Sequence, residues 1–363
     1  MAVLDKFFIK EESVGLNMSQ IKVGLPAALL YYYYFPFWFK LFDELNIELV
    51  VSDNTSRKLL DKGTKNAISE ICVPIKIMVG HILNLKEKEV DYIYLPRFKS
   101  LKKGTVMCPK FLGLPDLIKH TFPEFKNIII SDIIKSKSDN ISQYHNFINL
   151  KEKLNRSKFD MKSALKKSAL FWERFRELLF SGYLIDDFLK ANNIKSLEKI
   201  IADLEQSSLL PQSKQQESFG REEFIDIALI GYVYNVYDSY INMDIIKKCK
   251  ELGVRVHTFS MVKEEIIESE LKKLRKPMFW EFTNKLYGAC EYYLKNKRID
   301  GIIHLTAFGC GPDSVLSQIL EFDAKNYNKP FMTLRIDEQT GESHIITRIE
   351  AFVDLLRLKK EEC

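Results

Sequence analysis

The chain has 363 residues, of which 46% are hydrophobic and 28% are charged, and its formal net charge is +5. This composition is typical of a soluble globular protein with room for two hydrophobic cores. Basic and acidic residues are interspersed, which argues against a dedicated nucleic-acid-binding protein. The longest apolar run, residues 25–39, contains four tyrosines and two prolines and is too short to span a bilayer. Residues 1–20 lack the apolar core of a signal peptide, so we expect a cytoplasmic protein that is not bound to a membrane.

Two parts of the chain alternate short apolar strands with amphipathic helices. Such a pattern is typical of parallel sheets that are built from βαβ units. We therefore predict an α/β fold with two Rossmann-like domains, each a doubly wound and mainly parallel sheet, and a helical segment between them. In the first part we expect strands at 21–25, 48–52, 91–95 and 127–130, with helices at 37–45 and 56–69. In the second part we expect strands at 225–230, 254–259, 301–306 and 330–336, with helices at 243–252 and at the C-terminus.

The stretch between these two parts is helical in pattern over residues 149–204. Its apolar residues recur at helical spacing: Leu165, Leu170, Phe171, Phe175 and Leu178. Residues 206–220 are rich in Gln and Ser, which is typical of a linker. The predicted organisation is an N-terminal extension over 1–20, a first α/β domain over 21–148, a helical segment and linker over 149–220, and a second α/β domain over 221–363.

Three cysteines share one local context. Cys72, Cys108 and Cys310 each lie one or two residues before a proline, at the expected start of a helix. Proline is favoured in the first turn of a helix, and a side chain just ahead of it faces free backbone N–H groups and the positive end of the helix dipole. This setting favours a thiolate over a thiol. Three thiolates from distant parts of one chain indicate an iron–sulfur cluster.

Four interpretations of these cysteines stay open. In the first interpretation, the cysteines are buried structural residues. This explains Cys249 and Cys290, which lie inside helical patterns without a turn. A structural zinc site normally contains ligand pairs that are close in sequence, whereas here the gaps are 36 and 202 residues. A catalytic thiol at Cys310 lacks an evident base and leaves the other two cysteines unexplained. A [4Fe–4S] cluster with three cysteine ligands would leave one iron open to water, to Ser314 or to a substrate.

A set of short motifs runs from about residue 21 to about residue 356. The motifs are Val23–Pro26, Tyr32–Trp38, Glu70–Lys76, Gly80–His81, Leu95–Arg97, Cys108–Pro109, Gly113–Asp116, Phe308–Ser314, Arg335–Glu342 and Arg348–Phe352. Through them the sequence resembles the 2-hydroxyacyl-CoA dehydratase D-component superfamily, which also contains benzoyl-CoA reductase subunits. The resemblance is closest to the acyl-CoA dehydratase activase-related branch of that superfamily.

The resemblance implies one [4Fe–4S] cluster, held by Cys72, Cys108 and Cys310 between two Rossmann-like domains. It also implies an anaerobic cytoplasm and low-potential electrons from an ATP-dependent activator protein. The implied chemistry is the reduction or dehydration of an acyl-CoA or another small molecule, and a related subunit or a second copy is an expected partner. One departure is Ala27, where this branch usually has Arg, which puts an anion-binding role of that turn in doubt. The sequence contains no G-x-x-x-x-G-K-[ST] motif, in keeping with a separate ATPase.

Three further residues are candidates for a ligand cleft. Arg97 ends an expected strand, and it either faces the cleft or forms a surface salt bridge. Asn235 follows the first strand of the second part, where it either lines a ligand site or belongs to an ordinary turn. Ser314 lies one helical turn after Cys310. Two other functions compete with the leading one: a non-catalytic carrier or relay of electrons, and a metal-free α/β ligand-binding protein.

Overall fold

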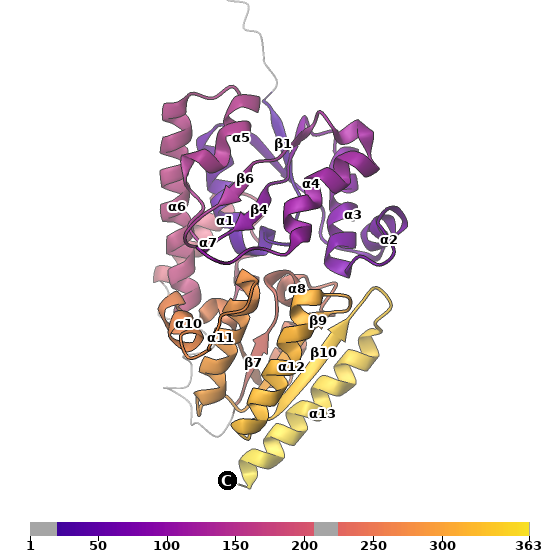
Figure 1. Cartoon of the computed structure of the whole chain (residues 1–363), viewed down its shortest axis with the longest axis vertical. Helices are drawn as coiled ribbons and strands as arrows, with labels where there is room; N and C mark the ends of the chain where they lie inside the picture. The colour runs from indigo at the N-terminus through magenta and orange to yellow at the C-terminus, as the bar shows by residue number, and fades with distance from the viewer. Residues whose placement is uncertain (1–19, 207–223, 363) are drawn as a thin grey trace, which may run out of the picture.

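The computed structural model describes residues 20–206 and 224–362, and its described part contains two four-stranded parallel sheets flanked by helices (Figure 1). The first sheet has the order β2-β1-β3-β5 and consists of β1 (Lys22–Leu25), β2 (Glu48–Val51), β3 (Tyr92–Tyr94) and β5 (Ile129–Ile130). The second sheet has the order β10-β9-β7-β8 and consists of β7 (Ile225–Ile230), β8 (Val254–Thr258), β9 (Gly301–Ala307) and β10 (Phe331–Ile336). The predicted α/β fold with parallel sheets is confirmed.

Both sheets have the same strand order. In each half the first strand lies between the second and the third, and the fourth strand follows the third. This is the flavodoxin-like doubly wound order, in which the chain reverses its direction of winding beside the first strand. Ligands of such sheets bind outside the carboxyl ends of the strands at that point. The topology therefore directs attention to the carboxyl ends of β1 and β7.

A short second pair of strands extends the first sheet. β4 (Arg97–Ser100) and β6 (Ile133–Lys135) pair in parallel, directly after β3 and β5. The N–H groups of Leu95 and Arg97 donate to the carbonyls of Ile130 and Asp132 over 2.8 Å each, so the parallel pairing continues past Pro96. Arg97 thus begins a strand, whereas the sequence pattern predicted that it would end one.

The helices of the first half and of the central segment surround this sheet. Those of the first half are α1 (Tyr31–Glu44), α2 (Arg57–Asn66), α3 (Val73–Glu87) and α4 (Pro109–Thr121). The expected helical segment contains α5 (Ile148–Lys153), α6 (Lys158–Phe180) and α7 (Ile194–Gln206). Four of the five residues of its expected stripe are buried, and Leu170 is 58% exposed. Apart from residues 20 and 206, the predicted N-terminal extension and linker lie outside the described residues.

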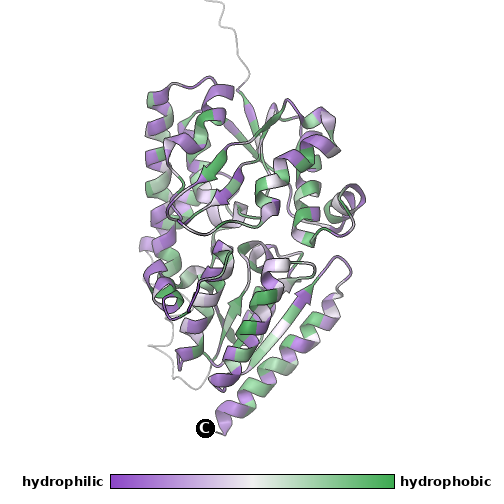
Figure 2. Cartoon of the chain, viewed as in Figure 1, coloured by the Kyte–Doolittle hydropathy of each residue, from purple (hydrophilic) through white to green (hydrophobic). Residues whose placement is uncertain are grey.

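The second half surrounds its sheet in the same way. Its helices are α8 (Val233–Tyr237), α9 (Ile245–Glu251), α10 (Glu264–Leu271), α11 (Glu281–Lys295), α12 (Gly311–Asn326) and α13 (Glu342–Glu361). Short 3₁₀ helices cover Pro123–Phe125, Tyr144–Phe147, Ile185–Asp187 and Phe259–Met261. Apolar residues concentrate in the inner strands, while polar residues colour the outer faces of the helices (Figure 2). All seven residues of β9 are buried, as a central parallel strand requires.

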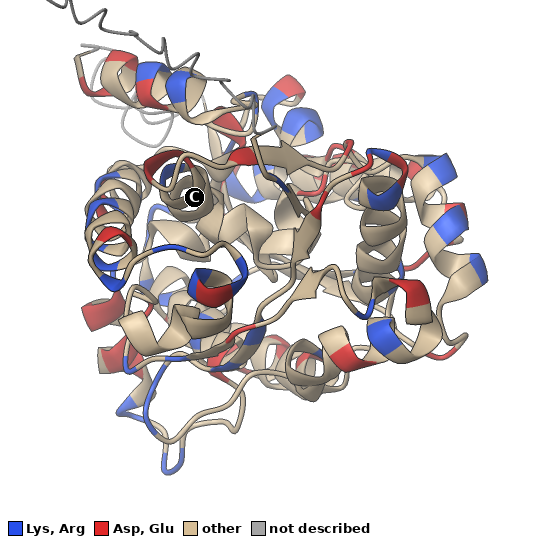
Figure 3. Cartoon of the chain, turned by 90° about the horizontal axis from the view of Figure 1, so that it is seen from above, with Lys and Arg blue, Asp and Glu red and all other residues tan. Residues whose placement is uncertain are grey.

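Charged residues of both signs are interspersed along the outer helices (Figure 3). Among the described residues, no helix is both long and apolar enough to cross a membrane.

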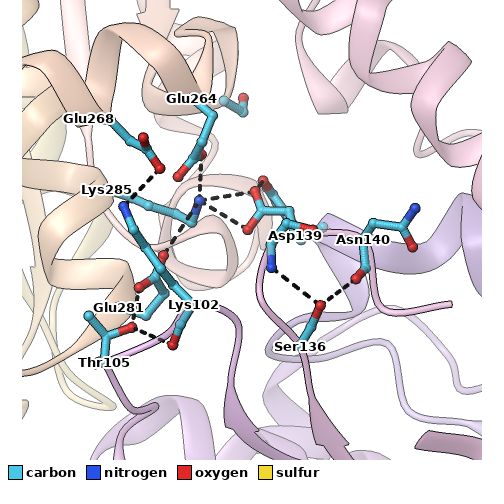
Figure 4. Close-up of polar contacts among 12 residues, drawn as sticks. Lys102, Thr105, Ser136, Asp139, Asn140, Glu264, Glu268, Glu281 and Lys285 are labelled. Atoms are coloured by element: carbon cyan, nitrogen blue, oxygen red, sulfur yellow. Dashed lines mark hydrogen bonds and ion pairs between the residues drawn. The ribbon is translucent and has the colours of Figure 1, made fainter. Parts of the chain in front are cut away.

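The two halves contact each other through buried charges as well as apolar packing. Lys285 of α11 is 1% exposed, and its Nζ lies 3.0 Å from Asp139 of the first half and 2.6 Å from Glu264 (Figure 4). A second ion pair joins Lys76 of α3 to Glu338 of the second half over 2.6 Å.

Candidate functional site

The three cysteines with a shared sequence context line one cavity between the two halves. This cavity, here called the cysteine cavity, has a volume of about 250 Å³. Cys72 and Cys108 come from the first half and Cys310 from the second, and all three are partly exposed free thiols. The other described residues that line the cavity are Leu29, Pro74, Ile75, Met107, Pro109, Lys110, Phe111, Tyr232, Tyr234, Trp280, Phe282, Gly311 and Pro312. Residues that are far apart in the sequence thus meet around one mainly apolar space.

Each of the three cysteines is the N-cap residue of a helix. Cys72 precedes α3, Cys108 precedes α4 and Cys310 precedes α12, each with a proline at the first or second helical position. The sulfur atoms lie at the helix starts, where the backbone of Lys110 lowers the pKa of Cys108 and the backbone of Asp313 lowers the pKa of Cys310 by hydrogen bonding. The predicted helix-start context of all three cysteines is confirmed.

The carboxyl ends of strands from both sheets reach the cavity. Leu29 follows β1, Tyr232 follows β7 and Cys310 follows β9. Gly309 has a φ of +74°, a left-handed conformation that favours glycine, and it turns the chain between β9 and Cys310. A Cβ atom at Gly309 or Gly311 would meet no atom within 4 Å, so the space beside Cys310 is open.

The protonation of the thiols differs from the sequence prediction. Burial raises the pKa of Cys310 to about 12, and the neighbouring Asp313 carboxylate adds to the rise. Burial also raises the pKa of Cys108. The helix N-termini act in the opposite direction, but desolvation of a charged sulfur in an apolar cavity outweighs them. These two cysteines are therefore thiols at neutral pH, and a coordinating metal would have to displace their protons.

The arrangement does not form a finished site for a single metal ion. Among the described residues, no three His, Cys, Asp or Glu side chains are positioned to hold one ion as they stand. The sulfur atoms instead surround the cavity from three helices. Thiolates on a multi-iron cluster bind different irons and lie further apart than thiolates that share one ion. The donor chemistry and the open space beside Cys310 fit a group of that larger kind.

An aromatic wall, which the sequence did not predict, closes the cavity. The rings of Tyr232 and Tyr234 are stacked with centroids 5.3 Å apart, and Phe111 approaches Tyr234 at 6.2 Å. Trp280 and Phe282 also line the cavity. Tyr232 and Tyr234 alternate directly after a strand, and this was the one local sequence signal of the wall. The other rings come to the cavity through tertiary packing.

A buried pair lies behind Cys310. His304 of β9 and Asp313 of α12 are both 0% exposed, and the His304 Nε2 lies 3.1 Å from the Asp313 Oδ1. The other ring nitrogen and the other carboxylate oxygen have no hydrogen-bond partner among the described residues. The pair fixes the first turn of α12, whose N-cap is Cys310.

The other predicted site residues lie away from the cavity lining. Arg97 donates two hydrogen bonds to the Asp116 carboxylate and a third to the Leu112 carbonyl over 3.1 Å. Of the two alternatives that the sequence left open for Arg97, the structure therefore shows the salt bridge. The Ser314 Oγ donates to the Cys310 carbonyl over 2.7 Å, as a polar residue in the first turn of a helix commonly does. Asn235 is 1% exposed, and its side-chain amide has no partner among the described residues.

The loop that follows β7 lines a second cavity, which is polar. Asp238, with Ser52 and Thr55, lines a polar cleft of about 550 Å³ at the carboxyl ends of β1 and β2. The Thr55 hydroxyl donates to Asp238 over 2.6 Å. Burial raises the pKa of Asp238 to about 6, and this hydrogen bond opposes the rise.

A family model matches more than half of the chain. The model described as the CoA enzyme activase uncharacterised domain matches residues 22–262. The chain belongs to this family. The matched region contains Cys72, Cys108 and the first two strands of the second sheet, and it ends before Cys310. The comparison with curated proteins found no match. Membership agrees with the activase-related branch of the resemblance seen in the sequence.

Proposed function

We propose that the protein carries one [4Fe–4S] cluster in the cysteine cavity, held by Cys72, Cys108 and Cys310. The observation that carries the proposal is the meeting of three free thiols, from three helix starts in two halves, around one apolar space. Cubane clusters are bound by cysteine thiolates, and an apolar surround controls the access of solvent and the potential of such a group. A bound cluster would supply one-electron chemistry at low potential.

The family description supports a place for this chemistry in an acyl-CoA enzyme system. In the proposal, an ATP-dependent activator protein delivers electrons to the chain. The role of the protein's own residues is to exclude water and to hold the ligands in place. Tyr232, Tyr234 and Phe282 close the cavity, while the His304–Asp313 pair fixes the turn behind Cys310.

The size of the cavity favours an electron relay as a second candidate function. Sites for small molecules usually have volumes of about 300–1,000 Å³. The cysteine cavity has about 250 Å³ and would have to contain the cluster as well. This leaves little room for a substrate. A relay that passes electrons to another subunit requires no such room.

Anaerobic purification with analysis of iron and sulfide tests the proposal. The protein should be brown, absorb broadly near ~400 nm and contain about four irons per chain. Cys72→Ala, Cys108→Ala and Cys310→Ala should each lose most of the bound iron. Cys249→Ala and Cys290→Ala are the controls, because both residues are buried away from the cavity. An iron-free protein would favour a metal-free ligand-binding protein. Full iron content in any one of the first three variants would remove that cysteine from the proposed ligand set.

The electron paramagnetic resonance spectrum of the reduced protein separates the two cluster functions. An enzyme that binds its substrate at the cluster should show a changed spectrum when an acyl-CoA is added. A relay should show the same spectrum with and without it.

A further inference from the structure

A third hollow, which is lined by lysines, lies on the surface near the cysteine cavity. It has a volume of about 710 Å³ and opens between the loop after β4 and the segment that joins α10 to α11. Its four lysines, Lys102, Lys103, Lys272 and Lys276, define what is here called the lysine cleft. Glu268 is the single acidic residue among the described residues that line it. The cleft therefore has a positive balance, although the molecule as a whole is only weakly basic.

Most of this positive charge is not compensated within the described residues. Lys102 pairs with Glu268 over 2.9 Å (Figure 4). Lys103, Lys272 and Lys276 are exposed and form no ion pair with another described residue. Several ammonium groups around one hollow repel each other and attract anions. Lysine is a common binder of phosphate groups.

The cleft also presents an aromatic ring. Phe279 is 64% exposed although it lines the cleft. Its segment is held in place, because Asn284 forms two hydrogen bonds of 2.8 Å with the backbone of Met278. Val106 pairs with Trp280 in an isolated parallel bridge directly after Phe279. The ring is thus displayed by an ordered backbone, and a flat group can stack on such a ring.

We propose that the lysine cleft binds an organic phosphate with at least two phosphate groups and a flat ring, of the kind found in a nucleoside diphosphate. The lysines receive the phosphates and Phe279 receives the ring. The proposal rests on the cleft alone and is independent of iron in the cysteine cavity.

The two sites share a wall, which provides a readout. Phe279 lines the lysine cleft, and the next residue, Trp280, lines the cysteine cavity. The chain has three tryptophans, and the other two, Trp38 in α1 and Trp172 in α6, are buried. A ligand on Phe279 should therefore change the emission of Trp280 most.

Titration of the full chain with ADP, inorganic pyrophosphate and adenosine tests the proposal by calorimetry and by tryptophan emission. ADP should bind most tightly, pyrophosphate more weakly, and adenosine not measurably. The affinity for both phosphates should fall as the salt concentration rises. Absence of binding by ADP and pyrophosphate at low salt would overturn the proposal.

Variants distinguish the cleft from general electrostatic attraction. Lys103→Glu with Lys276→Glu should weaken ADP and pyrophosphate at least tenfold. Phe279→Ala should weaken ADP and leave pyrophosphate unchanged. The control is Lys297→Glu with Lys359→Glu, which makes the same change in net charge at exposed positions outside the cleft. Equal weakening by this control would show that the net charge of the protein, and not the cleft, attracts the phosphates.

Discussion

At the scale of single residues, His81 shows how burial determines chemistry in this fold. The His81 side chain is 0% exposed, with its Nδ1 2.7 Å from the Ser52 Oγ and its Nε2 3.0 Å from the Thr55 Oγ1. Because the Thr55 hydroxyl donates to Asp238, its oxygen is free to accept from His81. The ring is then neutral with its proton on Nε2, and it accepts from Ser52 at Nδ1. Burial lowers the pKa of His81 to about 3, and the charge of Asp53 opposes the shift only in part.

This buried histidine should make the fold sensitive to mild acid. Below its ordinary pKa of 6.5 the unfolded chain binds a proton at this residue, whereas the folded protein does not until about pH 3. Stability should therefore fall by about 1.4 kcal/mol for each pH unit below 6.5 because of this one group. Urea unfolding at pH 6.5 and at about pH 4.5 should show a loss that is about 2–3 kcal/mol larger in the wild type than in His81→Gln.

The exposed His344 provides the control for this prediction. His344→Gln should keep the pH dependence of the wild type. Asp132 and Asp238 change the stability in the opposite direction. Burial raises the pKa of each to about 6, so the folded protein binds a proton there at a higher pH than the unfolded chain does, and stability rises as the pH falls from 6 toward 3.8. They are present in every variant, so they cancel in the comparison. The same acid sensitivity in His81→Gln and in the wild type would contradict the assignment.

At the scale of elements, the position of Cys72 depends on how closely α2 and α3 pack. A Cβ atom at Gly80 of α3 would lie 2.3 Å from the Leu59 carbonyl oxygen, and one at Gly63 of α2 would lie 1.9 Å from the Lys76 carbonyl oxygen. Only glycine permits such an approach of two backbones. Because Cys72 is the N-cap residue of α3, this contact also helps to position one of the three thiols.

Gly80→Ala should force the two helices apart and lower the free energy of unfolding by about 1–3 kcal/mol. Gly113→Ala is the matched control, because Gly113 lies in α4 and a Cβ atom there would meet no atom within 4 Å. That control should raise the stability by about 0.5–1 kcal/mol, as alanine does inside a helix. Thermal or urea unfolding of both variants measures the difference. A loss in Gly113→Ala as large as in Gly80→Ala would show that the effect is not specific to the contact.

Elements differ in how far the sequence could predict them. The strands β7 and β9 were predictable, because strands buried on both faces are continuous apolar runs. β4 was missed, since Arg97 and Lys99 alternate with buried residues and follow a proline. α1 begins at Tyr31, before the expected residue 37, and three of its four tyrosines are buried in the core.

The candidate site was also only partly predictable from the sequence. The positions of the cysteines were predictable, because a proline marks each helix start locally. Their protonation was not, since burial depends on the aromatic rings that tertiary packing brings to the cavity. Trp280 has no local signal of its role. A parallel bridge pairs its backbone with Val106, and its side chain and Cys108 line the same cavity.

At the scale of the whole molecule, the cysteine cavity exists only while the two halves stay together. Neither half supplies all three thiols. The Tyr33 hydroxyl donates to Asp139 over 2.5 Å, and Lys285 reaches the same carboxylate from the second half (Figure 4). Burial alone would raise the pKa of Asp139, but the charges of Lys285 and Arg176 outweigh it and hold the pKa below its ordinary value. The carboxylate is therefore ionised and depends on its partners.

Replacing Lys285 with methionine should strongly destabilise the union of the halves. It would remove the cation that forms ion pairs with the buried Asp139 and Glu281, and the loss of one partner of a buried ion pair costs about 3–5 kcal/mol. Lys285→Met with Asp139→Asn should recover part of this loss, because the second change removes one of the unpaired charges. Lys273→Met is the control: Lys273 is 58% exposed, and its buried partner Glu270 keeps a second cation, Lys295, so the loss of Lys273 should cost less than about 1 kcal/mol. Equilibrium urea unfolding measures all three variants. Equal stability of Lys285→Met and Lys273→Met would mean that the ion pairs of Lys285 do not help to join the halves around the cavity.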